Sequence, residues 1–249
     1  MSSNRSSVND VNRPQPNVLI LGIGNLLWAD EGFGVRAVET LQQWYRYPEH
    51  VRAMDGGTQG VYLVQEVRES DLLIVFDAID YGLPPGTLKL IEGEAVPKYL
   101  GVKKVSLHQT GFQEVLALAE MLGDYPEKIL LIGVQPVEIE DFGGSLRSEV
   151  KAQIEPAIEQ AIAFLSAHGI SVSRRTRPLL ADRLSSAISD MTRYEHERPG
   201  PEQACRLGDE RVLLSGEYQI EHRPAALDGS AMSVGLDQHL NKYRTDTRG

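Results

Sequence analysis

The chain has 249 residues, 41% of them hydrophobic, and carries a formal net charge of −10 at pH 7. This length and composition allow one full hydrophobic core, while the acidity argues against nucleic acid, which needs a basic surface. No stretch reaches the roughly 18 apolar residues needed to cross a bilayer. Cys205 is the single cysteine, which excludes an internal disulfide and a thiolate metal cluster. We therefore expect a cytoplasmic protein without membrane contact.

The pattern of the chain divides it into three parts. Residues 1–16 are polar and lack the apolar centre of a signal peptide, which predicts a disordered leader. Residues 17–170 alternate between strand and helix patterns and predict one α/β domain. Residues 171–249 are polar, interrupted by proline and balanced in charge, so we expect a tail that is mostly disordered or loosely docked.

Hydrophobic periodicity predicts nine elements within the domain. In chain order they are a strand at 18–23, a helix at 34–45, a strand at 51–55, a helix at 61–67, a strand at 72–79, a weaker strand at 87–94, a helix at 107–122, a strand at 128–134 and a helix at 148–169. Pro156 either kinks the last helix or lies in its first turn. The order predicts a three-layer α/β sandwich, in which helices cover both faces of a mostly parallel, twisted sheet of about five strands.

The glycine-rich stretch GIGNLLWADEGFG, residues 22–34, directly follows the first predicted strand. Its first two glycines match the start of a dinucleotide-binding fingerprint, but Leu27 stands where the third glycine belongs. Asp30 and Glu31 would also repel a phosphate at the start of the next helix, so we expect no nucleotide cofactor. Alternatively, the two acids only support that helix, Asp30 as its cap and Glu31 through the helix dipole.

Three segments at predicted strand ends or helix starts carry side chains that suit a divalent cation: Glu31, Asp77 and His108. Ligands of open α/β sheets collect beyond the carboxyl ends of the strands, and a buried carboxylate needs a partner or a cation. A helix N-terminus keeps an imidazole neutral and able to coordinate metal. Two carboxylates and one imidazole suit a borderline divalent ion with open positions. In the alternative, Asp77 caps the following turn and His108 is an ordinary histidine at a helix start.

Five stretches occur in this order along residues 17–170: LGIGNLLWADEGFGVRAVETL, MDGGTQG, LLIVFDAID, SLHQTGFQEVLALAEMLG and LIGVQPVEIEDFGGSLRSEV. Together they resemble the hydrogenase maturation proteases, endopeptidases that process the large subunit of nickel–iron hydrogenases. The resemblance implies removal of a C-terminal extension from the large-subunit precursor once nickel has been inserted. It assigns the metal-binding trio to Glu31, Asp77 and His108, and makes Asp55 of the DGGT turn a candidate for substrate handling.

From the resemblance we expect nickel to arrive with the substrate, without a permanent catalytic metal in the enzyme. The nickel then acts as a Lewis acid or activates water, or a carboxylate of Asp30, Asp55 or Asp77 acts as general base. The motifs of serine hydrolases and zincins are absent from the sequence. The expected partners are the large-subunit precursor and possible hydrogenase assembly chaperones. The rivals are a chaperone that senses nickel without cutting and a small nucleotide-binding α/β protein.

Overall fold

A computed structural model of the chain describes residues 15–97, 107–179 and 191–197, without the side chains of residues 107–110. Most of the predicted leader and most of the predicted tail therefore lie outside the described residues. Within the described ranges, no helix combines the length and the apolar character that crossing a membrane requires.

The described elements agree with the predicted order. They are β1 (Val18–Ile23), the 3₁₀ helix η1 (Ala29–Gly32), α1 (Phe33–Trp44), β2 (Tyr45–Arg46), β3 (Val51–Gly57), η2 (Gly60–Leu63), α2 (Val64–Arg68), β4 (Leu72–Ala78), β5 (Leu88–Glu92), η3 (Gly93–Ala95), α4 (Leu107–Met121), β6 (Lys128–Val134), α5 (Ser148–Lys151), α6 (Ile154–Ala167), β7 (Ser173–Arg174) and α7 (Met191–His196). The helix predicted over 148–169 is divided into α5 and α6. Pro156 lies in the first turn of α6, where its missing N–H leaves no helical hydrogen bond unmade.

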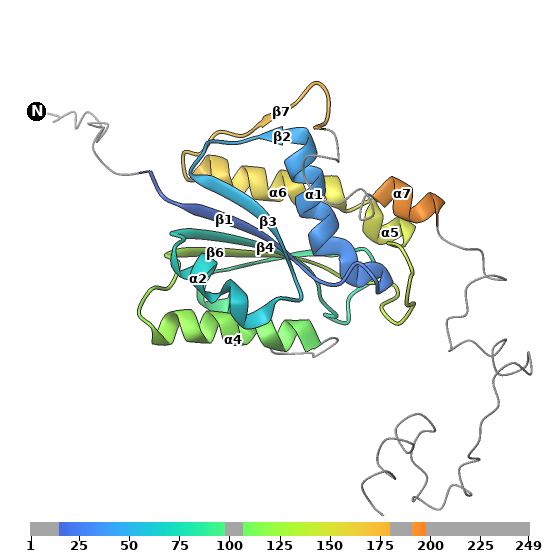
Figure 1. The fold of residues 1–249 in the computed structure, drawn as a ribbon, viewed down its shortest axis with the longest axis horizontal. Coiled ribbons are helices and arrows are strands. Elements are labelled where there is room, and N and C mark those ends of the chain that lie inside the picture. Colours follow the sequence, from blue (N-terminus) through green and yellow to red (C-terminus); the bar gives the residue numbers. More distant parts are fainter. Residues whose placement is uncertain (1–14, 98–106, 180–190, 198–249) are drawn as a thin grey trace, which may run out of the picture. The chain divides into compact units, whose positions relative to one another are not determined.

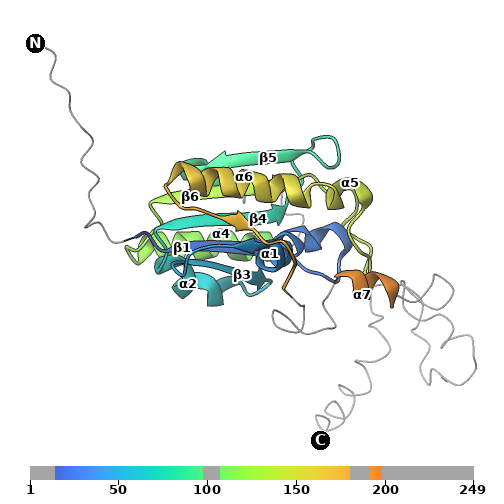
Figure 2. The same cartoon turned by 90° about the horizontal axis from the view of Figure 1, so that it is seen from above.

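Five strands form one sheet in the order β3-β1-β4-β6-β5. The first four run parallel, and β5 is antiparallel to β6 at one edge (Figure 2). Helices α1 and α6 cover one face, and α2 and α4 cover the other (Figure 1). All residues of β1 and β4 are buried, as expected for central parallel strands with helices on both faces. The predicted three-layer α/β sandwich is confirmed.

The start of α1 packs directly against the sheet through two glycines. A Cβ on Gly34 would collide with the carbonyl oxygens of Phe76 and Ile23, and a Cβ on Gly22 would collide with the carbonyl of Gly34. Gly34 is therefore the glycine that lets the helix pack closely on the sheet. The dinucleotide-binding fingerprint would have this glycine at position 27, where the chain has Leu27. Gly34 comes later in the chain because η1 is inserted between β1 and α1.

Two short pieces of the predicted tail contact the domain. Strand β7 pairs antiparallel with β2. In α7, the Glu195 carboxylate accepts hydrogen bonds from Lys151 Nζ and Ser145 Oγ, each 2.8 Å long. The Arg36 guanidinium lies over the Tyr194 ring, 5.6 Å from its centroid. These contacts attach α7 to α1, to α5 and to the segment that leads into α5.

We predict that Gly34→Ala lowers the free energy of unfolding by at least about 2 kcal/mol, because the added methyl group forces the backbones of α1 and the sheet apart. Urea denaturation monitored by circular dichroism measures this change. The control is Gly111→Ala in α4, where an added Cβ meets nothing closer than Gly60 Cα at 3.5 Å. That variant should be as stable as the wild type or up to about 1 kcal/mol more stable. A Gly34→Ala protein with wild-type stability would contradict the close approach.

Candidate functional site

The candidate residues gather where the parallel strands end. Gly22 of β1 is in register with Asp55 of β3 on one side and with Phe76 of β4 on the other. Asp77 therefore lies at the same end of the sheet as Asp55, with β1 between their strands. Successive side chains of a strand point to opposite faces. Since Phe76 packs with α1 and α6, and Val75 packs with α2 and α4, Asp77 points towards the α4 face.

Asp77 is the sixth residue of β4, and its side chain is only 3% exposed. On the same face, α4 begins at Leu107, which confirms that His108 belongs to the first turn of a helix. The beginning of α4 lies near the carboxyl ends of the strands, because Gly111 lies close to Gly60, the first residue of η2 after β3. The first turn of α4 therefore lies at the same end of the sheet as Asp77.

Glu31 belongs to η1 and is half-buried. Its N–H donates to the Trp28 carbonyl at 2.9 Å, and its carbonyl accepts the N–H of Asn25 at 3.2 Å. Gly24 has its backbone so close to the Glu31 carbonyl that a Cβ there would collide with it. Glu31 therefore lies just beyond the end of β1.

The backbones of the three predicted metal ligands reach one edge of the sheet from three different segments. No three histidine, cysteine, aspartate or glutamate side chains form a metal site among those that the structure describes. The side chain of His108 lies outside that set, so the three-ligand site stays a prediction.

Asp30 is fully buried, and its carboxylate accepts three backbone hydrogen bonds. Oδ2 accepts the N–H groups of Val137 and Glu138 at 2.8 and 2.9 Å, and Oδ1 accepts the N–H of Arg147 at 2.7 Å. Neither η1 nor α1 has a side-chain cap. The interpretation of Asp30 as a helix cap is therefore wrong, because its carboxylate binds the backbone of residues 137–147.

Asp55 lies at the end of β3 in a different environment. Its side chain is exposed at the rim, yet desolvation by the surrounding protein raises the pKa of its carboxyl. A hydrogen bond from the Gly57 N–H and the positive charge of Arg36 both act in the opposite direction. Arg36 is only 3% exposed and forms an ion pair with Glu39 at 2.8 Å.

Two polar residues near the site were not among the sequence candidates. Gln135 follows β6, is 7% exposed, and accepts the N–H groups of Tyr81 and Leu83 at 2.8 and 3.1 Å. It thereby fixes the loop that follows β4 and Asp77. The other residue is Arg36. The only sequence signal for each was a polar side chain beside a buried apolar run.

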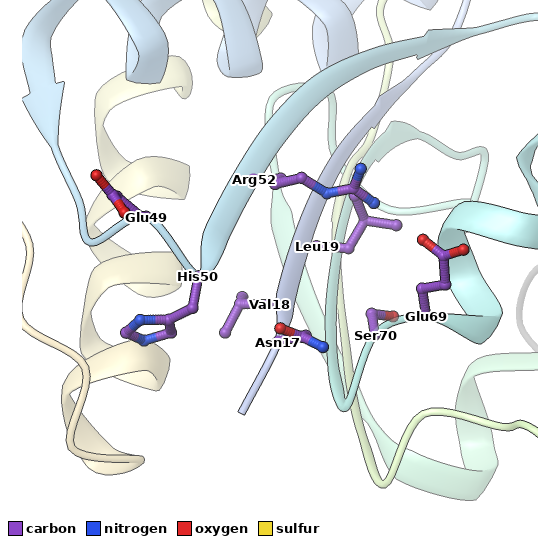
Figure 3. A pocket seen from close by; sticks show the side chains of 8 residues that line it. All are labelled: Asn17, Val18, Leu19, Glu49, His50, Arg52, Glu69 and Ser70. Atoms are coloured by element: carbon purple, nitrogen blue, oxygen red, sulfur yellow. The ribbon is translucent and has the colours of Figure 1, made fainter. Parts of the chain in front are cut away.

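A polar hollow of about 160 Å³ lies at the end of the sheet opposite to the candidate site, where the parallel strands begin (Figure 3). It is lined by Asn17, Val18, Leu19, Glu49, His50, Arg52, Glu69 and Ser70. These residues surround the amino ends of β1 and β3. The hollow therefore contains none of the candidate ligands and is separate from the candidate site.

Comparison with known proteins gives a consistent result. A family model described as hydrogenase maturation protease matches residues 35–164. The hydrogenase expression/formation protein HupD of Thiocapsa roseopersicina is 62% identical over 205 residues, which cover 82% of this chain and 92% of that protein. The hydrogenase 2 maturation protease of Escherichia coli K12 is 42% identical over 159 residues, or 64% of this chain and 96% of that protein. The solved structure of the E. coli hydrogenase maturating endopeptidase HybD matches with a TM-score of 0.61 and 40% identity, over 64% of this chain and 98% of the other.

The environment of Asp55 predicts a titration midpoint for its carboxyl above the ordinary aspartate value of about 3.9, because desolvation by the surrounding protein raises the pKa more than Gly57 and Arg36 lower it. Arg36→Gln should move the midpoint further up, since it removes the cation that favours the ionised form. Carbon-13 NMR of the carboxyl group measures both. The control is Arg46→Gln, at an exposed position in β2, which should leave the midpoint unchanged. A wild-type midpoint at or below the ordinary value would contradict this assignment.

Proposed function

The chain belongs to the hydrogenase maturation protease family and is an endopeptidase, and from this premise we propose that it removes the C-terminal extension of a nickel–iron hydrogenase large-subunit precursor after nickel insertion. The observation that supports the proposal is that Asp77, the η1 turn with Glu31 and the first turn of α4 with His108 all lie at the carboxyl ends of the parallel strands. Hydrogenase assembly chaperones are further partners to be expected. The membership in a family of endopeptidases argues against a chaperone that does not cut.

In this proposal, nickel is part of the substrate. Glu31, Asp77 and His108 bind the ion that the precursor already holds, and the precursor supplies the remaining ligands. Two carboxylates and one imidazole leave positions open for such sharing. A precursor without nickel then lacks part of the recognition surface, so cleavage becomes a test of metal loading. Shared coordination also orients the scissile bond.

Two routes to cleavage fit the candidate site. The nickel polarises the scissile carbonyl or activates water, or an aspartate accepts a proton from the attacking water. Among the aspartates, Asp77 is buried and is itself a proposed nickel ligand, and Asp55 is exposed at the rim. Asp30 is less suited to this role, because both of its oxygens already accept backbone N–H groups inside the protein.

We predict that Glu31→Gln, Asp77→Asn and His108→Ala each slow the processing of nickel-loaded precursor by at least about a hundredfold, since each removes one ligand of the shared ion. Mass spectrometry of the precursor C-terminus follows the cut, and circular dichroism verifies folding. The control variant Glu92→Gln changes an exposed residue of the edge strand β5, and it should process the precursor at the wild-type rate. If all three ligand variants cleave normally, the proposed site is wrong.

The second prediction concerns the metal. Precursor from nickel-depleted cells should remain uncut, whereas the same preparation loaded with nickel should be cut, because only the loaded form offers an ion to the three ligands. Equal cleavage of both forms would remove nickel recognition from the proposal and leave the endopeptidase activity in place.

A further inference from the structure

Residues 27–30 and 137–147 are joined by hydrogen bonds into one layer near the carboxyl ends of the strands. We call this layer the lip. Besides the three bonds to the Asp30 carboxylate, the Asp30 N–H donates to the Glu138 carbonyl at 3.0 Å, and the Gly143 N–H donates to the Leu27 carbonyl at 2.7 Å. Trp28 forms isolated β-bridges with Phe142 and Gly144. The Trp28 and Phe142 rings meet edge-on, with centroids 5.2 Å apart.

The Asp30 carboxylate is the part of the lip that an uncharged side chain cannot replace. An ionised carboxylate only accepts hydrogen bonds, so all three N–H groups find an acceptor. An amide has a single oxygen, and its own N–H₂ group would face a backbone N–H. Because Asp30 is fully buried, water cannot compensate for the loss.

Asp30 is bonded covalently to Glu31, the proposed nickel ligand from η1. The peptide of Glu31 is held by Trp28 and Asn25, and the side chain before it is held by residues 137–147. We propose that Asp30 is a positioning residue of the protease: it locks the lip and thereby fixes Glu31, and it takes no proton from water or substrate. This inference rests on the proposed function, because the precursor is its substrate.

The lip also presents apolar side chains to the surface. Leu27, Val137 and Phe142 are 47%, 43% and 50% exposed. A loosened lip displaces both Glu31 and these side chains, so it weakens the binding of the precursor. The chemical step is affected less than in a Glu31 variant, because the Glu31 carboxylate is still present and the lip itself supplies no reacting group. A positioning role therefore predicts a change in KM, whereas a general base predicts a change in kcat.

The test is Asp30→Asn in the full-length protein, with precursor processing and amide hydrogen exchange measured on the same samples. We expect KM for nickel-loaded precursor to rise at least about tenfold with kcat within about threefold of the wild type. The amides of Val137, Glu138 and Arg147 should exchange at least about tenfold faster. Glu31→Gln should lose processing but keep the protection of these amides, and Glu92→Gln should match the wild type in both measurements.

A large fall in kcat with wild-type amide protection would overturn the proposal, because Asp30 would then act in the chemical step. Unchanged KM and unchanged exchange would overturn it as well.

If Asp30→Asn does not fold, Arg147→Met replaces it, since that variant breaks the 2.9 Å ion pair of Arg147 with Asp141 and leaves Asp30 intact. A raised KM then supports a positioning lip, and a wild-type KM contradicts it. If the wild type does not cut the precursor, the proposed function is refuted. The amide exchange measurement would still test whether Asp30 holds the lip together.

Discussion

The backbone contact between Gly22 and Gly34 determines where the site residues lie. It brings α1 so close to β1 and β4 that no side chain fits between them. The connection from β1 to α1 must therefore rise above the end of β1, where it forms η1. Asp30 and Glu31 are neighbours in this turn, and the turn directs one inward and leaves the other at the sheet edge. In dinucleotide-binding folds a close helix–sheet contact of this kind serves phosphate binding. In this protein the contact determines where Asp30 and Glu31 lie.

The three candidate aspartates illustrate how environment decides the role of one residue type. Asp30 is buried among backbone N–H groups, Asp77 is buried at a strand end, and Asp55 is exposed near the charge of Arg36. Sequence assigns all three to the same sheet edge, because each follows or ends an apolar strand. It does not separate them, because the partners of Asp30 lie 107 to 117 residues away along the chain.

Elements with a local pattern were predictable from the sequence, whereas those set by distant contacts were not. The buried strands and the long amphipathic helices were found because their apolar periodicity is continuous over several residues. Strand β7 has two residues and α7 has six, which is too short for a periodic pattern. Both are held by partners elsewhere, β7 by β2 and α7 by Lys151 and Ser145. Gln135 and Arg36 could not be predicted from the sequence for a similar reason. Gln135 acts on the loop after β4, and Arg36 is covered by α7, and both partners are distant in the chain.

The contacts of α7 extend the site beyond the domain predicted at 17–170. The Arg36 guanidinium lies over the Tyr194 ring, and its positive charge works against the desolvation that raises the pKa of Asp55, so one buried cation contacts the tail and acts electrostatically on the rim. The 205-residue match to the Thiocapsa relative is longer than that domain, so the shared sequence does not stop at the domain borders. The proposed function requires ligands that are already in place at the carboxyl ends of the strands, where they can reach an ion held by a folded precursor. The lip lies at the carboxyl ends of the strands, and α7 is bonded to the lip through Ser145 and packs on Arg36 of α1 through Tyr194.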